Sequence, residues 1–250
     1  MKSIFMPWVV LLPALKHSLA TFESLLERAD VRNLILSILG LIVFWHIYTP
    51  IHELLHAGAC LLGGGTVEEL AIKAQYGGSL LKHVFPFVVD NSDYAGQLTG
   101  FSTPNDFVYA FVDLAPYFLT LVGLTLIEWC RRRGNAFMFG LGILLAYIPF
   151  MSVTGDYYEL VSLVTTRLAD GSVDPRLLIS DDVFKLVGEL SDSGQLTGRH
   201  LTLVIIGMLG SIYAALMTLA LQVVILKKIY GSEVMDIAPT ETAGAGDSTS

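Results

Sequence analysis

Four stretches of the sequence are apolar over enough residues to cross a lipid bilayer, and they limit the fold more than any other feature. They cover residues 34–62, 108–130, 136–153 and 201–226. A transmembrane helix needs about 20 mainly apolar residues, because the hydrocarbon core is about 30 Å thick and each helical residue rises about 1.5 Å. Lipid offers no partner to backbone polar groups, which favours helices. The sequence therefore predicts an all-α polytopic, multi-pass integral membrane protein with about four transmembrane helices.

Composition and charge agree with this location. Hydrophobic residues make up 53% of the chain and charged residues only 15%, an apolar excess over ordinary soluble domains. The formal net charge is -8, and no soluble segment carries the clustered Lys and Arg that nucleic-acid binding needs. We therefore expect a lipid bilayer, and no nucleic acid, as a partner. Cys60 and Cys130 lie in or at the end of apolar stretches and are predicted to be packing residues.

The segments near the N-terminus and after the first apolar stretch are predicted to be smaller elements. In residues 1–33, Pro7 and Pro13 split a short apolar run, which favours an interfacial or re-entrant segment over a complete crossing. Residues 63–107 begin with glycines and continue, from Thr66, with a partial alternation of polar and apolar residues. This alternation is typical of a strand and predicts a small membrane-associated hairpin.

The later connections constrain the packing of the four stretches. The short connection at residues 131–134 predicts that the second and third stretches are antiparallel neighbours. Residues 154–200 carry apolar side chains at helical spacing, which predicts surface helices. The first stretch is too long for one straight crossing, and Pro50 is a candidate kink because it lacks an N–H. Residues 231–250 are rich in Thr, Ala, Gly and Ser and predict a disordered tail.

The first apolar stretch contains the residues His52-Glu53-Leu54-Leu55-His56, an H-E-x-x-H pattern. Residues four apart lie on one face of a helix, so both imidazoles can bind one Zn²⁺ while Glu53 points toward its open coordination position. Zinc activates a water in such sites, and a carboxylate takes the proton as the water attacks a carbonyl carbon. The pattern predicts His52 and His56 as metal ligands and Glu53 as the general base of peptide hydrolysis.

The apolar surroundings of the motif favour this interpretation over a chance match. A charged side chain at the centre of a membrane helix costs about 2.5–3.5 kcal/mol on insertion scales, so three ionisable residues there need a metal or polar partners. A metal-free cluster of buried polar residues is the alternative interpretation.

A zinc site of this kind needs a third protein ligand. Asp156 is the first candidate, because it follows the start of the third stretch by about as many residues as His52 follows the start of the first, and the two stretches run in the same direction. Glu159 is the reserve, and Asp113 in the second stretch is a further candidate. His46 lies six residues before His52, on a different face of the helix, and is predicted to be a hydrogen-bonded interior residue.

These residues resemble the site-2 protease family of intramembrane zinc metalloproteases. The resemblance begins at His52, where the motif is followed by small residues, a run of glycines and a short strand. Ala115-Pro116 is similar to the family's Gly-Pro segment. Pro149 with Gly155-Asp156 resembles its Pro and Leu-Asp-Gly, in which the Asp is the third zinc ligand. The likeness covers roughly residues 34–165 and identifies residues 34–230 as a membrane-embedded metalloprotease domain.

The resemblance implies an intramembrane zinc metalloendopeptidase with a transmembrane protein as substrate. Two positions depart from the family pattern: Ala146 and Tyr147 stand where an Asn usually precedes the Pro, and Tyr157 stands where Gly follows the Asp. A catalytically silent relative that binds membrane partners is therefore the alternative. An edge strand at residues 66–74 is predicted to hold an unwound substrate by strand addition.

The membrane orientation follows from the basic residues. The positive-inside rule places residues 131–133, 227 and 228, together with Arg28 and Arg32, in the cytoplasm. The metal site then lies toward the extracytoplasmic side, whereas the family resemblance implies a site near the cytoplasmic side. Both orientations stay open at this point.

Overall fold

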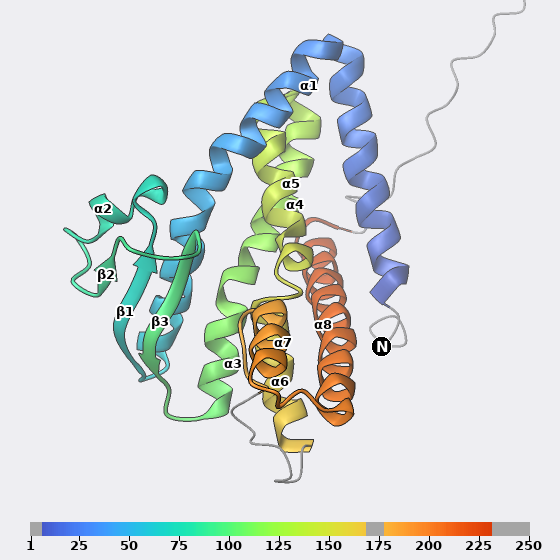
Figure 1. Ribbon diagram of the computed structural model, residues 1–250. Coiled ribbons are helices and arrows are strands. Elements are labelled where there is room, and N and C mark those ends of the chain that lie inside the picture. Colours follow the sequence, from blue (N-terminus) through green and yellow to red (C-terminus); the bar gives the residue numbers. More distant parts are fainter. Residues whose placement is uncertain (1–6, 169–177, 232–250) are drawn as a thin grey trace, which may run out of the picture.

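A computed structural model of the protein describes residues 7–168 and 178–231. Four of its helical stretches are long and apolar enough to cross a membrane: Leu11–Leu62, Asp106–Arg133, Ala136–Arg167 and Gly198–Tyr230. They pack side by side, and a small sheet lies against one side of the bundle (Figure 1). The predicted all-α polytopic fold with about four long apolar helices is therefore confirmed.

The first helix, α1 (Pro7–Leu62), is sharply bent into two arms that form an inverted V (Figure 1). The break lies at Ala29 and Asp30, and Asp30 has a positive φ of 27°. Asn33 secures the bend, because its Nδ2 donates to the carbonyl of Leu25 at 2.5 Å. We call residues 7–28 the N-terminal arm and residues 31–62 the second arm. The predicted kink at Pro50 is not the main bend, since Pro50 lies within helical backbone.

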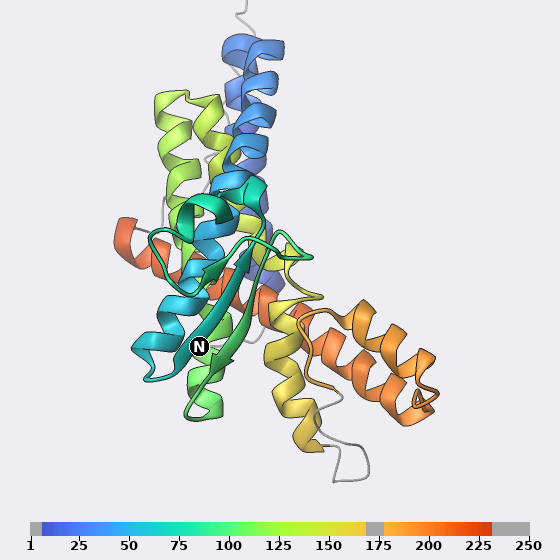
Figure 2. The same cartoon turned by 60° about the vertical axis from the view of Figure 1, so that its left-hand side comes forward.

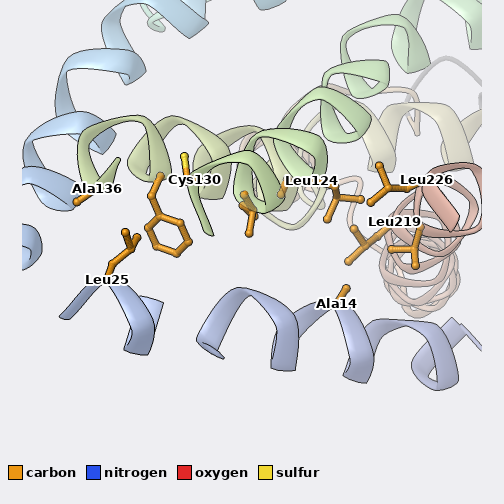
Figure 3. Packing of buried hydrophobic residues seen from close by; sticks show 11 residues of the cluster. Ala14, Leu25, Leu124, Cys130, Ala136, Leu219 and Leu226 are labelled. Atoms are coloured by element: carbon orange, nitrogen blue, oxygen red, sulfur yellow. The ribbon is translucent and has the colours of Figure 1, made fainter. Parts of the chain in front are cut away.

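The N-terminal arm lies lengthwise on the bundle. Ala14 and Leu25 are fully buried against three later helices, α4 (Leu119–Arg133), α5 (Ala136–Met151) and α8 (Gly198–Tyr230) (Figure 3). Two polar contacts add to this packing: the Nε2 of His17 lies 3.2 Å from the Oε2 of Glu128, and the hydroxyls of Ser18 and Tyr147 lie 2.8 Å apart. Among residues 1–33, the described part is thus a helix docked along the bundle, and its interfacial or re-entrant placement in the membrane stays a prediction.

The segment after α1 forms a three-stranded sheet rather than a simple hairpin. Strands β1 (Thr66–Ile72), β2 (Val88–Val89) and β3 (Gly96–Ser102) have the order β2-β1-β3. β1 is antiparallel to β3 and parallel to the short β2, while η2 (Ala74–Tyr76) and α2 (Gly78–Leu81) lie between β1 and β2. The prediction of β1 as an edge strand is therefore wrong, because β2 pairs with the side of β1 that faces away from β3. β2 has only two residues and no clear strand pattern in the sequence.

The second and third apolar stretches are each interrupted. The second consists of α3 (Asp106–Leu114), the 3-10 turn η3 (Ala115–Phe118) and α4 (Leu119–Arg133). The third is longer in the structure than the predicted residues 136–153, because α5 (Ala136–Met151) continues through a short turn into α6 (Asp156–Leu168). The prediction that residues 154–168 form a surface helix is wrong, because Tyr157 and Tyr158 at the start of α6 are fully buried.

Helix α5 packs against α1 and α4 at very short range (Figure 2). A Cβ on Gly140 of α5 would collide with the backbone of α1 at Ser37 and Leu41, so glycine is needed at this contact. Close backbone approach through small residues is a common means of packing helices in membranes. The predicted antiparallel pairing across residues 131–134 is confirmed, with Gly134 ending α4 in the left-handed conformation.

The remaining elements are α7 (Val183–Asp192) and α8 (Gly198–Tyr230). α7 is the predicted amphipathic surface helix, with Val183, Leu186 and Leu190 buried and Phe184 exposed. α8 crosses the lower half of the bundle obliquely (Figures 1 and 2) and contributes Leu219 and Leu226 to the core shown in Figure 3. The predicted disordered tail, residues 231–250, lies outside the described residues except for Gly231.

Candidate metal centre

The two histidines of the H-E-x-x-H pattern lie on one face of the second arm of α1. Because they are four residues apart in continuous helix, their rings meet edge to face, and their Nε2 atoms lie 3.0 Å apart. Both side chains are buried, with 8% of His52 and 7% of His56 exposed. The local sequence alone thus brings two nitrogen ligands to one point.

Asp156 reaches the same point from the first residue of α6. Its Oδ2 lies 3.1 Å from the Nε2 of His52 and 3.5 Å from the Nε2 of His56. The turn that separates α5 from α6 sets this position, because α6 begins at Asp156 itself. Tyr117 of η3 donates its hydroxyl to the same Oδ2 and orients the carboxylate.

The three ligand atoms have the spacing that a metal ion requires. They all lie within 4.8 Å of one another, and their separations are 3.0, 3.1 and 3.5 Å. Ligands at about 2.0–2.1 Å from a tetrahedral ion are roughly 3.3 Å apart, so one ion between these atoms satisfies all three with small movements. His52, His56 and Asp156 therefore form a candidate metal-binding triad.

Hydrogen bonds on the far side of each imidazole hold the ligand nitrogens toward this point. The Nδ1 of His56 lies 2.8 Å from the carbonyl oxygen of Val112, so Nδ1 must carry a proton and Nε2 is left with its lone pair. The Nδ1 of His52 lies 2.5 Å from the hydroxyl of Tyr48, one turn earlier in α1. Such outer contacts fix the tautomer and the ring orientation of metal ligands.

Glu53 lies beside the triad and lines a pocket of about 320 Å³ that opens next to it. Only 8% of Glu53 is exposed. Its side chain packs against Gly96, the first residue of β3, where a Cβ would collide with the Cγ of Glu53. The pocket lies between β3, α3 and the α5–α6 turn, with the chain before α7 on its rim. Glu53, His56 and Asp156 all face this space.

The other residues considered from the sequence lie outside the triad. Glu159 and Asp113 line the same pocket, but neither belongs to the group of converging ligand atoms. His46 is exposed and does not belong to the group of converging ligand atoms. Its ring stacks on Tyr76, with 5.2 Å between ring centroids. The prediction of His46 as an interior residue is therefore wrong, although its hydrogen bond to the carbonyl of Ile42 is present.

Sequence reasoning missed the residues that support the triad. Tyr48 precedes His52 by four residues, and this spacing on one helix face is a signal that could have identified it. Tyr117 follows the Ala115-Pro116 pair, but nothing in the sequence indicates that its hydroxyl reaches Asp156. The contribution of Val112 is a backbone carbonyl, which no residue type reveals.

Comparison of the chain with known protein families, curated proteins and solved structures finds no match. The resemblance to site-2 proteases therefore stays an expectation from the sequence motifs alone.

Proposed function

We propose that the protein is an intramembrane zinc metallopeptidase that cleaves peptide bonds of membrane-spanning substrates. The observation that carries this proposal is the convergence of His52, His56 and Asp156 beside Glu53, within helices that are apolar enough to cross a membrane. A hydrolytic zinc site uses three protein ligands and leaves one position open, and the pocket at Glu53 supplies the space for a reactant.

Zinc is the proposed ion because of the donor set and the neighbouring acid. Two imidazoles and one carboxylate suit Zn²⁺, although the same donors also occur with Fe²⁺ in oxygenases. Glu53 favours hydrolysis, since a carboxylate that follows the first histidine of the pattern is placed to act as a general base. When bound, zinc supplies a Lewis acid that lowers the pKa of water and polarises a carbonyl group.

The residues of this chain have separate roles in the proposed reaction. Glu53 takes the proton from the attacking water and passes it to the departing amine. Tyr117 and the Val112 carbonyl hold Asp156 and His56 in position. On the side away from the pocket, the histidines pack against buried apolar clusters, which include Tyr48 and Tyr117 on one flank and Ala59 and Val112 on the other.

Strand β3 is the proposed binding edge for the substrate backbone, in place of β1. β3 pairs with β1 on one side only, and its residues Gly96, Gln97 and Leu98 line the pocket next to Glu53. A membrane-spanning helix hides its carbonyl groups and must unwind before cleavage. Addition of the unwound segment to β3 would replace the lost helical hydrogen bonds with main-chain bonds.

The catalytically silent alternative rested on the departures from the family pattern, and their places in the fold give it little support. Tyr147 turns toward the N-terminal arm and contacts Ser18, while Tyr157 packs on Tyr117 with 4.5 Å between ring centroids. Neither tyrosine lines the pocket at Glu53. The departures thus leave the proposed reaction space unchanged.

The decisive experiment combines metal analysis with a cleavage assay on purified protein in detergent. We expect about one zinc per chain in wild type and in Glu53→Gln, and a loss of hydrolysis of at least about 100-fold in the variant. Glu68→Gln, an exposed acid of β1, is the matched control. Wild-type protein without zinc, or a Glu53→Gln variant within about tenfold of wild type, would overturn the proposal. Zinc without any cleavage would favour the silent relative.

A further inference from the structure

The pocket beside the triad is more acidic than the proposed zinc chemistry requires. Its described lining contains six acidic side chains and no Lys or Arg. Asp156 and Glu53 belong to the metal site, and together they balance the two positive charges of a zinc ion. The four remaining acids are Asp113, Glu159, Asp181 and Asp182. Their presence in the pocket therefore needs another explanation.

Two of these four acids already have structural partners. Asp182 is the N-cap of α7, where its Oδ1 accepts from the backbone N–H groups of Phe184 and Lys185 at 2.9 and 3.0 Å. Its Oδ2 accepts the hydroxyl of Tyr94 at 3.1 Å. Asp181 accepts the side-chain amide of Gln97. Both acids are explained by the way the chain before α7 is held on β3.

Asp113 differs from them, because it is buried and one of its carboxyl oxygens has no hydrogen-bond partner among the described residues. Only 4% of the residue is exposed, and its Oδ2 is shielded from solvent without a hydrogen bond to any described residue. Leaving a buried polar group unpaired is unfavourable, and the cost rises for a charged group. This carboxyl group lines the pocket, so a ligand that enters the pocket can supply the missing partner.

Glu159 lies beside Asp113 through their shared neighbour Tyr109. Tyr109 and Asp113 are four residues apart on one face of α3, and the hydroxyl of Tyr109 donates to the Oε1 of Glu159 on α6. Glu159 follows the triad residue Asp156 by three residues, which places it about one turn, or roughly 5 Å, farther along α6. The two acids thus form a second pair of carboxyl groups about one helical turn from the metal site.

We propose that Asp113 and Glu159 form a specificity subsite that binds a basic side chain of the substrate, next to the bond that is cleaved. This inference rests on the proposed peptidase function and adds a substrate class to it. A Lys or Arg side chain provides the charge that the pocket lacks and a donor for the unpaired Oδ2 of Asp113.

The test compares two quenched-fluorescent peptides that differ only in one residue, Lys or the uncharged norleucine, placed in turn at each position around the cleaved bond. We expect zinc-loaded wild type to prefer Lys at one position by at least about tenfold in kcat/KM. Asp113→Asn and Glu159→Gln should each lower the ratio of kcat/KM for the Lys peptide to that for the norleucine peptide by about fivefold or more. Asp192→Asn and Glu189→Gln, exposed acids of α7, are the matched controls and should retain it.

A second measurement does not depend on hydrolysis. The Glu53→Gln protein should bind the Lys peptide more tightly than the norleucine peptide in fluorescence anisotropy, and adding Asp113→Asn should remove the difference. No Lys preference in wild type, or an unchanged preference in both subsite variants, would overturn the subsite. A second bound zinc that Asp113→Asn removes would also overturn it. Lys-selective binding without any hydrolysis would overturn the proposed function and leave the subsite standing.

Discussion

The Nε2 of His52 lies 3.1 Å from the Oδ2 of Asp156, although 104 residues separate them in the chain. The second arm of α1 carries the histidine, and the break between α5 and α6 presents the aspartate at the first residue of a helix. A carboxylate is favoured at a helix N-terminus, where unpaired N–H groups and the helix dipole stabilise negative charge. The contact therefore joins two helices at the point where both present metal-binding atoms.

Asp156→Asn should weaken metal binding more than any change of a neighbouring acid. The amide loses the negative charge that favours a divalent cation, while the contact with the Tyr117 hydroxyl can be kept. We expect zinc affinity to fall by about tenfold or more, measured by competition with a fluorescent chelator.

Glu159→Gln is the matched comparison for metal affinity. Glu159 lies on the same helix but outside the converging ligand atoms, so zinc affinity should stay within about twofold of wild type. A larger effect of Glu159→Gln than of Asp156→Asn would transfer the ligand role to Glu159.

His56→Ala should remove the metal and destabilise the protein. The change deletes a ligand and removes the imidazole from the Val112 carbonyl, which keeps its helical hydrogen bond from the N–H of Ala115. Loss of one hydrogen bond costs about 0.5–1.5 kcal/mol, and each kcal/mol lowers Tm by about 2–4 °C for a domain of this size. Metal content and thermal unfolding in detergent measure both effects.

His46→Ala is the control for this variant, because His46 is exposed on the same helix. It should keep wild-type metal content and shift Tm by little. Normal zinc stoichiometry in His56→Ala would show that the histidine pair is not the metal site.

The parts of the fold that the sequence predicts well are those set by local pattern. Apolar length identifies the four long helices, and helical spacing brings His52 and His56 together without any tertiary information. The offset of Asp156 within its stretch also predicts its depth, since both segments are helical and run in the same direction. These features depend on the rise and the period of one helix.

The features that were predicted wrongly depend on tertiary contacts. The bend of α1 lies at Ala29 and Asp30, where Asn33 bonds back to Leu25, and no proline marks it. β1 becomes a central strand because the two-residue β2 pairs with it, and a strand that short leaves no periodic pattern. The buried place of α6 likewise follows from its packing on α8 rather than from its own polar residues.

Gly96→Ala should impair hydrolysis and leave the metal in place. The new methyl group would lie only 2.4 Å from the Cγ of Glu53, so the Glu53 side chain or the start of β3 must move. A small displacement of a general base lowers kcat strongly, and we expect a loss of about 10- to 100-fold with unchanged zinc content. Gly188→Ala in α7 is the matched control, because its Cβ would meet no atom. Equal activity of the two variants would remove Gly96 as the support of Glu53.

The fold predicts the membrane orientation more sharply than the charges alone. The Nη2 of Arg28 donates to the Arg131 carbonyl at 3.3 Å, so the bend of α1 and the α4–α5 connection lie at one basic end of the bundle (Figure 1). His52 follows Arg32 in the second arm by twenty residues, or about 30 Å, which is close to the thickness of the hydrocarbon core. If the basic end is cytoplasmic, the metal site lies near the opposite face.

Single cysteines at the two ends test this orientation. Arg133→Cys lies at the basic end, and Gln195→Cys precedes α8 at the other end; both positions are exposed, whereas the native Cys60 and Cys130 are fully buried. A membrane-impermeant maleimide added to intact cells should label Gln195→Cys at once and Arg133→Cys only after the membrane is permeabilised. The reverse labelling would place Arg133 outside the cell and the metal site near the cytoplasm, which is the orientation that the site-2 protease resemblance implies. It would also show that the positive-inside rule does not orient this chain.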